Sequence, residues 1–274
     1  MRLNPRPGAI ADGPAIHWLG QAGFWIDTGA HRLLIDPYLS DSLARKYAGK
    51  RFDHRRMMPV PVTPEALPRP DIVLITHAHT DHMDPDTLGP LHRRFPDLPF
   101  VVPAARVEAA RERIGENASL IAVNADDEPE PLPGLTLRVL PAAHEMFERD
   151  EKGQHVFLGY AFASGGARIA HSGDTIPYPG LAERFRDFGT DILLLPVNGR
   201  DAERRDAGIP GNLTLDEAIT VTTAAAARYL VPHHFGMFAF NTLDPATIDA
   251  AAAASRDPII LRPEIGMAMD LQKD

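Results

Sequence analysis

Short apolar runs, bounded by Gly, Pro and polar residues, recur along this chain, and most of them have the length of a β-strand. The expected strands span residues 16–19, 24–28, 33–36, 71–76, 135–140, 167–171, 192–195 and 229–232. The expected helices span residues 104–114, 213–228 and 246–254, and a further helix runs through Leu88 and Leu91. Strands that alternate with helices in this way predict an α/β protein whose sheets are covered by helices.

The strand expected at 71–76 leads directly into the most distinctive segment, Thr76-His77-Ala78-His79-Thr80-Asp81-His82. Shortly after it, Asp84-Pro85 supplies an N-cap residue and a Pro at the first helical position. The histidine motif is therefore expected in the turn between a strand and a helix.

Because the backbone changes direction quickly in such a turn, His77 and His79 can face one ion while Asp81 and His82 face a second. Neutral imidazole and carboxylate are ligands that zinc, manganese and iron accept. Surface histidines at a helix start would account for one His, but poorly for three together with an Asp. The motif predicts a metal site.

Further candidate ligands follow other expected strands. They are His144 after 135–140, Asp174 in the segment His171-Ser172-Gly173-Asp174, and His233 and His234 after 229–232. Taken singly, each residue is more typical of a partly buried histidine or a turn aspartate. Their recurrence at several strand ends predicts one site with many ligands.

The order His-x-His-x-Asp-His, a lone His, Gly-Asp-Thr and a late His resembles the metallo-β-lactamase superfamily over residues 18–267. Within it, the chain is most similar to the L-ascorbate-6-phosphate lactonase-like branch. The segments that carry this narrower resemblance are Trp18–Gly23, the Pro-rich stretch before the histidine motif, His171–Asp174 and Val231–His234. The resemblance implies a four-layer αββα sandwich with the metals at one edge, between the two sheets.

The resemblance also implies a ligand set. It assigns His77, His79 and His144 to the first metal, Asp81, His82 and His234 to the second, and Asp174 to both as a bridge. His234 is preferred to His233 because the ligand of the family stands two residues after the Pro, here Pro232. His233 is then a candidate for supporting a ligand or contacting substrate.

Composition narrows the chemistry and the setting. The chain has no Cys, so the site uses only nitrogen and oxygen ligands, and manganese or iron is credible beside zinc. A reducing, cytoplasmic setting is expected, because the chain also shows no apolar membrane span and no signal-peptide core. The net charge of −9 argues against nucleic acid as substrate. With 274 residues, 44% of them hydrophobic, the chain is expected to fold as one domain, residues 1–274.

Two other segments are candidates for substrate contact. The stretch between Asp36 and Pro70 shows no regular pattern. It predicts a pocket wall, with Tyr38 and the basic cluster of residues 50–58 near the substrate. The alternative is a solvated loop or an oligomer contact. Asn198 and Arg200 follow another expected strand and suit an anionic or polyhydroxylated group. A turn built on Asn198-Gly199 is the alternative.

The ligand set predicts a binuclear hydrolase in which two divalent cations generate a metal-bound hydroxide near neutral pH. Asp81 or Asp174 could then manage the proton of the leaving group. The lactonase-like branch implies a small-molecule substrate, a sugar-derived lactone with or without a phosphate, and an oligomeric protein. A small-molecule phosphodiesterase is the alternative, followed by a thioester hydrolase and a non-catalytic metal-dependent sensor.

Overall fold

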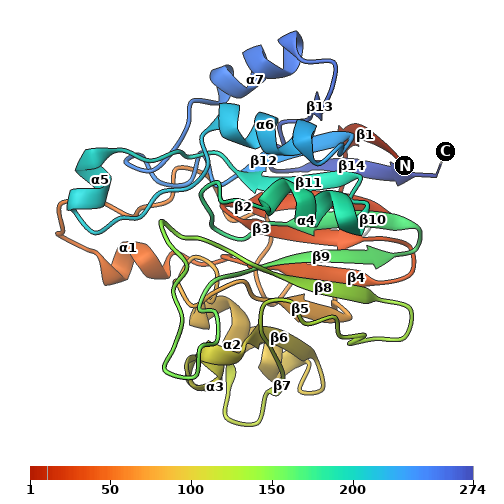
Figure 1. The fold of residues 1–274 in the computed structure, drawn as a ribbon. Coiled ribbons are helices and arrows are strands. Elements are labelled where there is room, and N and C mark those ends of the chain that lie inside the picture. The colour runs from red at the N-terminus through yellow and green to blue at the C-terminus, as the bar shows by residue number, and fades with distance from the viewer. Residues whose placement is uncertain (11, 274) are drawn as a thin grey trace.

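A computed structural model describes residues 1–10 and 12–273. Within these residues the strands form one sheet of eight, in the order β1-β14-β2-β3-β4-β5-β6-β7, and one of six, in the order β13-β12-β11-β10-β9-β8 (Figure 1). The strands are β1 (Arg2–Pro7), β2 (Ala15–Gly20), β3 (Gly23–Asp27), β4 (Arg32–Ile35), β5 (Ile72–Leu74), β6 (Pro99–Pro103), β7 (Ser119–Val123), β8 (Thr136–Pro141), β9 (Leu158–Ser164), β10 (Ala167–His171), β11 (Ile192–Pro196), β12 (Tyr229–His233), β13 (Ile259–Ile260) and β14 (Met267–Gln272).

Most of the helices lie on the outer faces of the two sheets, while α1 and α5 lie beyond the ends of the strands (Figure 1). They are α1 (Ser42–Lys46), α2 (Pro85–Arg94), η1 (Ala104–Arg106), α3 (Val107–Ile114), α4 (Leu181–Phe188), α5 (Ala202–Asp206), α6 (Leu215–Ala224) and α7 (Pro245–Ala254). Helices α2 and α3 cover the eight-stranded sheet, where Leu88 and Ile114 pack with Phe100 of β6. Helices α4 and α6 cover the six-stranded sheet, and α6 contacts β11 and β12.

The main core lies between the two sheets. Ile26 and Ile35 of the eight-stranded sheet belong to the same buried cluster as Tyr160 and Phe162 of the six-stranded sheet. The resulting order of layers is helix, sheet, sheet, helix, which confirms the predicted four-layer αββα sandwich.

Some predicted elements end elsewhere in the structure. The helix expected at 213–228 is α6, which starts after a capping box between Thr214 and Glu217 and ends before Ala226, whose φ is +55°. The helix expected at 104–114 divides into η1 and α3. The stretch from Asp36 to Pro70 was expected to be irregular, and it contains the short helix α1.

The strand directions bring the predicted ligand segments together. Strands β4, β5 and β6 are parallel, as are β10, β11 and β12, and β8 runs parallel to β10 because both are antiparallel to β9. The carboxyl ends of β4, β5, β8, β10 and β12 therefore meet at one edge of the sandwich. Among the described residues, no helix has the length and apolar character needed to cross a bilayer.

Candidate metal centre

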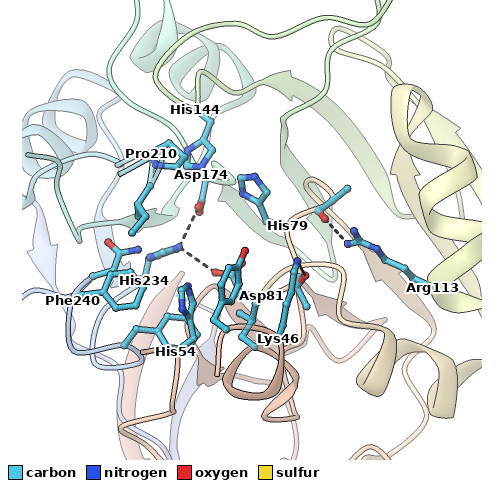
Figure 2. A pocket seen from close by; sticks show the side chains of 18 residues that line it. Lys46, His54, His79, Asp81, Arg113, His144, Asp174, Pro210, His234 and Phe240 are labelled. Carbon is cyan, nitrogen blue, oxygen red and sulfur yellow. Dashed lines mark hydrogen bonds and ion pairs between the residues drawn. The ribbon is translucent and has the colours of Figure 1, made fainter. Parts of the chain in front are cut away.

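A cavity of about 260 Å³ opens at this edge (Figure 2). We call its base the cavity floor, meaning the seven predicted ligands together. They are His77, His79, Asp81, His82, His144, Asp174 and His234. Five of these side chains line the cavity directly, while His77 and His82 lie fully buried beneath. We call residues 37–70 the loop wall, because Leu43, Lys46, Tyr47 and His54 from this segment line the cavity.

The histidine motif is held in place by the neighbouring strand. Asp36 follows β4, and its carboxylate accepts hydrogen bonds from the backbone N–H of Thr76 (2.8 Å) and from the Thr76 hydroxyl (2.5 Å). The same carboxylate lies 2.7 Å from His82 Nδ1. Asp36 thus fixes both the start of the motif and the orientation of one imidazole, so that Nε2 of His82 points to the other candidate ligands.

Asp174 and His234 complete one half of the floor. Nε2 of His234 lies 3.1 Å from Asp174 Oδ2 and 3.8 Å from Asp81 Oδ2, as the dashed lines in Figure 2 show. Nε2 of His82 lies 3.4 Å from Asp174 Oδ2. Ligand atoms of Asp81, His82 and His234 all lie within 4.8 Å of one another, and those of His77, His82 and Asp174 form a second such group.

Three imidazoles form the other half of the floor. The ring centroid of His77 lies 4.7 Å from that of His79 and 5.8 Å from that of His144, and the rings of His79 and His144 are 5.2 Å apart. Phe157 packs against all three rings. The structure therefore gathers the residues that the resemblance assigned to the first metal.

Metal ions fit this arrangement of side chains. Nε2 of His77, Nε2 of His82 and Oδ1 of Asp174 are buried and have no hydrogen-bond partner. Buried polar atoms normally have partners, and several orphaned ligand atoms that converge at one place are expected where a cation is bound. The donors are imidazole nitrogens and carboxylate oxygens, which suits zinc, manganese or iron.

The imidazoles and carboxylates of the floor shift one another's pKa values. Burial alone would raise the pKa of Asp174, but His234 and His82 outweigh it and hold this pKa well below its usual range. Burial would lower the pKa of His82, but Asp174, Asp81 and Asp36 hold it well above its usual value. Burial lowers the pKa of His144 to about 4, which keeps this imidazole neutral and able to act as a ligand. Metal binding at His82 would displace a proton.

Two supporting residues were not identified as site residues from the sequence, namely Asp36 and Gln21. Nε2 of Gln21 donates to Asp81 Oδ2 (2.8 Å), and its backbone carbonyl accepts from the His234 N–H (2.9 Å). Gln21, Asp36 and His234 have φ values of +52°, +40° and +62°, which non-glycine residues rarely adopt. Such strain is concentrated at functional sites. The available signal was position, because Asp36 ends a strand just as the predicted ligands do.

The turn that presents Asp174 requires glycine. Gly173 has a φ of +63°, and a Cβ at this position would lie 2.2 Å from the Leu158 carbonyl oxygen. Next to it, His171 accepts from the Gly173 N–H through Nδ1 and lies 3.0 Å from the Ala22 carbonyl through Nε2. His233, the predicted alternative to His234, is fully buried against the His171 ring with a centroid distance of 4.5 Å. It lies behind the floor and does not line the cavity.

The other three residues predicted to bind substrate also lie away from the cavity lining. The Tyr38 side chain is fully buried, and its hydroxyl accepts from the Leu43 N–H. Asn198 is buried and exchanges hydrogen bonds with Asn241 and Asn212. Arg200 forms a bidentate ion pair with Glu217, in which Nη1 and Nη2 each lie 2.6 Å from a carboxylate oxygen. The prediction for Arg200 overlooked this acidic partner on α6.

Residues that sequence reasoning did not single out form much of the cavity lining. His54 stacks on Tyr47 with a centroid distance of 4.1 Å and contacts the ring of Phe240 at 4.7 Å. Lys46 and Arg113 line the cavity as well. The loop wall therefore does contribute to the pocket, although through residues other than Tyr38.

The chain is similar in sequence to known metal-dependent hydrolases. A sequence profile described as a β-lactamase superfamily domain matches residues 31–235. A UPF0173 metal-dependent hydrolase of Pyrobaculum aerophilum is 26% identical over 247 residues, which cover 87% of this chain and 92% of that protein. N-acyl-phosphatidylethanolamine-hydrolyzing phospholipase D 1 of Caenorhabditis elegans is 24% identical over 239 residues, which cover 83% of this chain and 65% of that protein.

The chain spans 59% of the length of uncharacterised mycobacterial relatives that it matches at 28% identity. Among solved structures, the isothiocyanate hydrolase from Delia radicum gut bacteria has a similar fold. The TM-score is 0.75 at 17% identity, over 94% of this chain and 100% of the other. At this level of identity the similarity concerns the fold alone.

Proposed function

Because the chain belongs to the β-lactamase superfamily, we propose that it is a hydrolase that depends on two divalent metal ions bound at the cavity floor. The observation that carries this proposal is the convergence of buried, unpartnered imidazole and carboxylate atoms at the base of an open cavity. The proposed ligands are those predicted from the sequence, with Asp174 between the two halves of the floor. We propose zinc or manganese as the metal, with iron as a further candidate.

The residues of the chain divide the chemical work. When bound, the two cations would acidify a water molecule and polarise the substrate at the reacting centre. Asp36 and Gln21 orient His82 and Asp81, which keeps the ligand geometry fixed during turnover. Asp81 and Asp174 are the carboxylates that line the cavity, and either would take up the proton released by the attacking water and pass it to the leaving oxygen.

For the substrate we propose a lactone, and among lactones a small sugar-derived one, on the resemblance of the Trp18–Gly23 and His171–Asp174 segments to the lactonase-like branch. A cavity of about 260 Å³ suits a small molecule. We also propose that the protein works in the cytoplasm, without nucleic acid or membrane, and that it forms a homo-oligomer.

A small-molecule phosphodiesterase is the second candidate, and the similarity to a phospholipase D supports it. The same pair of cations can stabilise both the attacking and the leaving oxygen of a phosphodiester. Both reactions use the same fold and the same ligand set, so turnover is the property that separates them.

The test compares both reactions on one preparation. Metal-stripped protein is reloaded with manganese or zinc and assayed with sugar lactones, their phosphates and bis-p-nitrophenyl phosphate. Lactone turnover that depends on added metal and disappears in Asp174→Ala is the expected result. Phosphodiester turnover alone would replace the lactonase proposal with its alternative, and no metal-dependent turnover of any of these substrates would contradict both.

A further inference from the structure

Two cationic side chains line the cavity and have no carboxylate partner. Lys46, at the end of α1, donates a hydrogen bond to the Thr80 hydroxyl (3.2 Å), between the floor residues His79 and Asp81. Arg113, near the end of α3, donates through Nη1 to the carbonyl oxygens of Ala78 and Met83. Within residues 1–10 and 12–273, neither side chain forms an ion pair.

Four arginines around the cavity have carboxylate partners, whereas Arg56 donates to backbone carbonyls and does not line the cavity. Arg45 pairs with Asp86, Arg51 with Glu203, Arg55 with Asp53 and Arg200 with Glu217. Lys50 is an exposed cation of the same segment that lacks a partner, but it does not line the cavity. The chain has a net charge of −9, so carboxylates are abundant enough to pair with every cation. Two cations that line the cavity without a carboxylate partner are therefore available to attract an anionic ligand.

The opposite side of the cavity is aromatic and apolar. Figure 2 shows Lys46 and Arg113 on one side of Asp81, and Phe240 and Pro210 on the other. His54 packs between Tyr47 and Phe240, and Nδ1 of His54 lies 2.9 Å from the Phe52 carbonyl, which fixes the ring plane. The floor therefore lies beside a cationic side and a side of stacked rings, and the two sides meet at Tyr47, which contacts both Lys46 and His54.

We propose that the substrate is a small acid whose carboxylate or phosphate faces Lys46 and Arg113 while its ring or apolar face packs against His54 and Phe240. The assignment rests on the proposed hydrolytic function and names the class of substrate for that site. The reacting bond then lies above the floor, between the two anchors. Lys46 contributes by charge, since its ammonium is exposed and has no other ionic partner.

Arg113 has a second role that makes it a poor first target. Its hydrogen bonds to Ala78 and Met83 brace the histidine motif, so its removal would disturb the metal ligands as well as any anion. Lys46 lies on the loop wall, where it hydrogen-bonds only to the side chain of Thr80 and its ammonium lies 5.4 Å from the ring centroid of Tyr47. Lys46→Ala is the informative variant, and Lys50→Ala is its matched control, with the same charge change on the same segment.

The experiment measures charge selectivity with the metal-loaded full chain. γ-Butyrolactone and its 3-carboxylate provide a neutral and an anionic substrate with the same ring and reacting bond. Lys46→Ala is expected to raise KM for the carboxylate about fivefold to tenfold, as expected for the loss of one charge pair at the rim of a cavity. The KM for γ-butyrolactone and the kcat for both substrates are expected to stay unchanged. Lys46→Arg should restore the lower KM, and Lys50→Ala should match the wild type.

A binding measurement with compounds that cannot be hydrolysed tests the anion site independently of the proposed hydrolytic function. Cyclopentanecarboxylate and cyclopentanecarboxamide, which contain no hydrolysable lactone, are titrated calorimetrically into the same metal-loaded variants. Weaker binding of the carboxylate to Lys46→Ala than to Lys50→Ala, with the carboxamide unaffected, supports the anion site even if no lactone is hydrolysed. The anion site would be overturned if Lys46→Ala changed KM or binding equally for the charged and the neutral compound of a pair, or changed neither. The lactone turnover assay tests the proposed hydrolytic function independently of this result.

Discussion

The cavity floor and the loop wall are built in opposite ways. The floor side chains follow strand ends of two sheets and are mostly buried, and Asp36, Gln21 and Gly173 fix their surroundings. The loop wall contains one helix of five residues and includes many exposed side chains. It is attached to the rest of the molecule by the contact of His54 with the Phe240 ring and by the Met57 N–H, which donates to the Met237 carbonyl. Arg56 braces the wall internally, because it donates to the carbonyls of Tyr38 and Ser40. Changes in the floor should therefore affect metals and chemistry, whereas changes in the wall should affect substrate affinity.

Asp174→Ala is the sharpest test of the floor. The carboxylate lies 3.1 Å from Nε2 of His234 and 3.4 Å from Nε2 of His82, so its removal leaves both Nε2 atoms without their nearest carboxylate. We expect loss of one metal equivalent and a fall in kcat/KM of about a thousandfold or more, a scale typical of losing direct stabilisation of the transition state. Metal content by atomic emission and turnover on the best substrate measure the two effects.

The matched control for this variant is Asp187→Ala, on the exposed face of α4. It should retain both metals and full turnover. If Asp174→Ala kept two metals and normal turnover, the carboxylate would have no part in the centre, and the floor would have to be reassigned around the other six residues.

Asp36→Asn tests whether the residue that supports His82 contributes to metal affinity. The carboxylate lies 2.7 Å from His82 Nδ1 and also accepts two hydrogen bonds from Thr76, so an amide can keep the shape but loses the charge. Loss of an outer partner of a metal-binding histidine typically lowers metal affinity about 10-fold to 100-fold. Competition with a chromophoric chelator measures the change. Asp41→Asn, at an exposed position before α1, serves as the control, and equal metal affinity in both variants would show that Asp36 acts only on the fold.

The same contrast explains what could be predicted from the sequence. The ligand segments were found because imidazoles and carboxylates repeatedly follow apolar strands, and parallel strand ends must meet at one edge of a sheet. His54 and Lys46 were missed because nothing local marks a side chain in a long loop as facing a cavity. Arg200 was assigned to substrate because its partner Glu217 lies on a later helix, and that long-range ion pair has no sequence signature. The αββα order of layers came from the resemblance, since periodicity gives elements but not their stacking.

Arg56→Ala and Arg55→Ala form the mildest comparison, within the loop wall itself. Arg56 is partly buried and donates to Tyr38 (2.8 Å) and Ser40 (3.0 Å), whereas Arg55 is exposed and pairs only with its neighbour Asp53. Loss of hydrogen bonds from a charged group costs about 1.5–3 kcal/mol, and an exposed ion pair contributes about 0–1 kcal/mol.

We therefore expect Arg56→Ala to lower the free energy of unfolding measurably and to raise KM about threefold, because the wall that carries Lys46 and His54 is loosened, with metal content unchanged. Arg55→Ala should leave stability, KM and metal content at wild-type values. Denaturant unfolding and steady-state kinetics on the two variants side by side measure both quantities. Metal loss in Arg56→Ala would mean that the wall also supports the floor, and the two regions would then have to be treated as one structural unit.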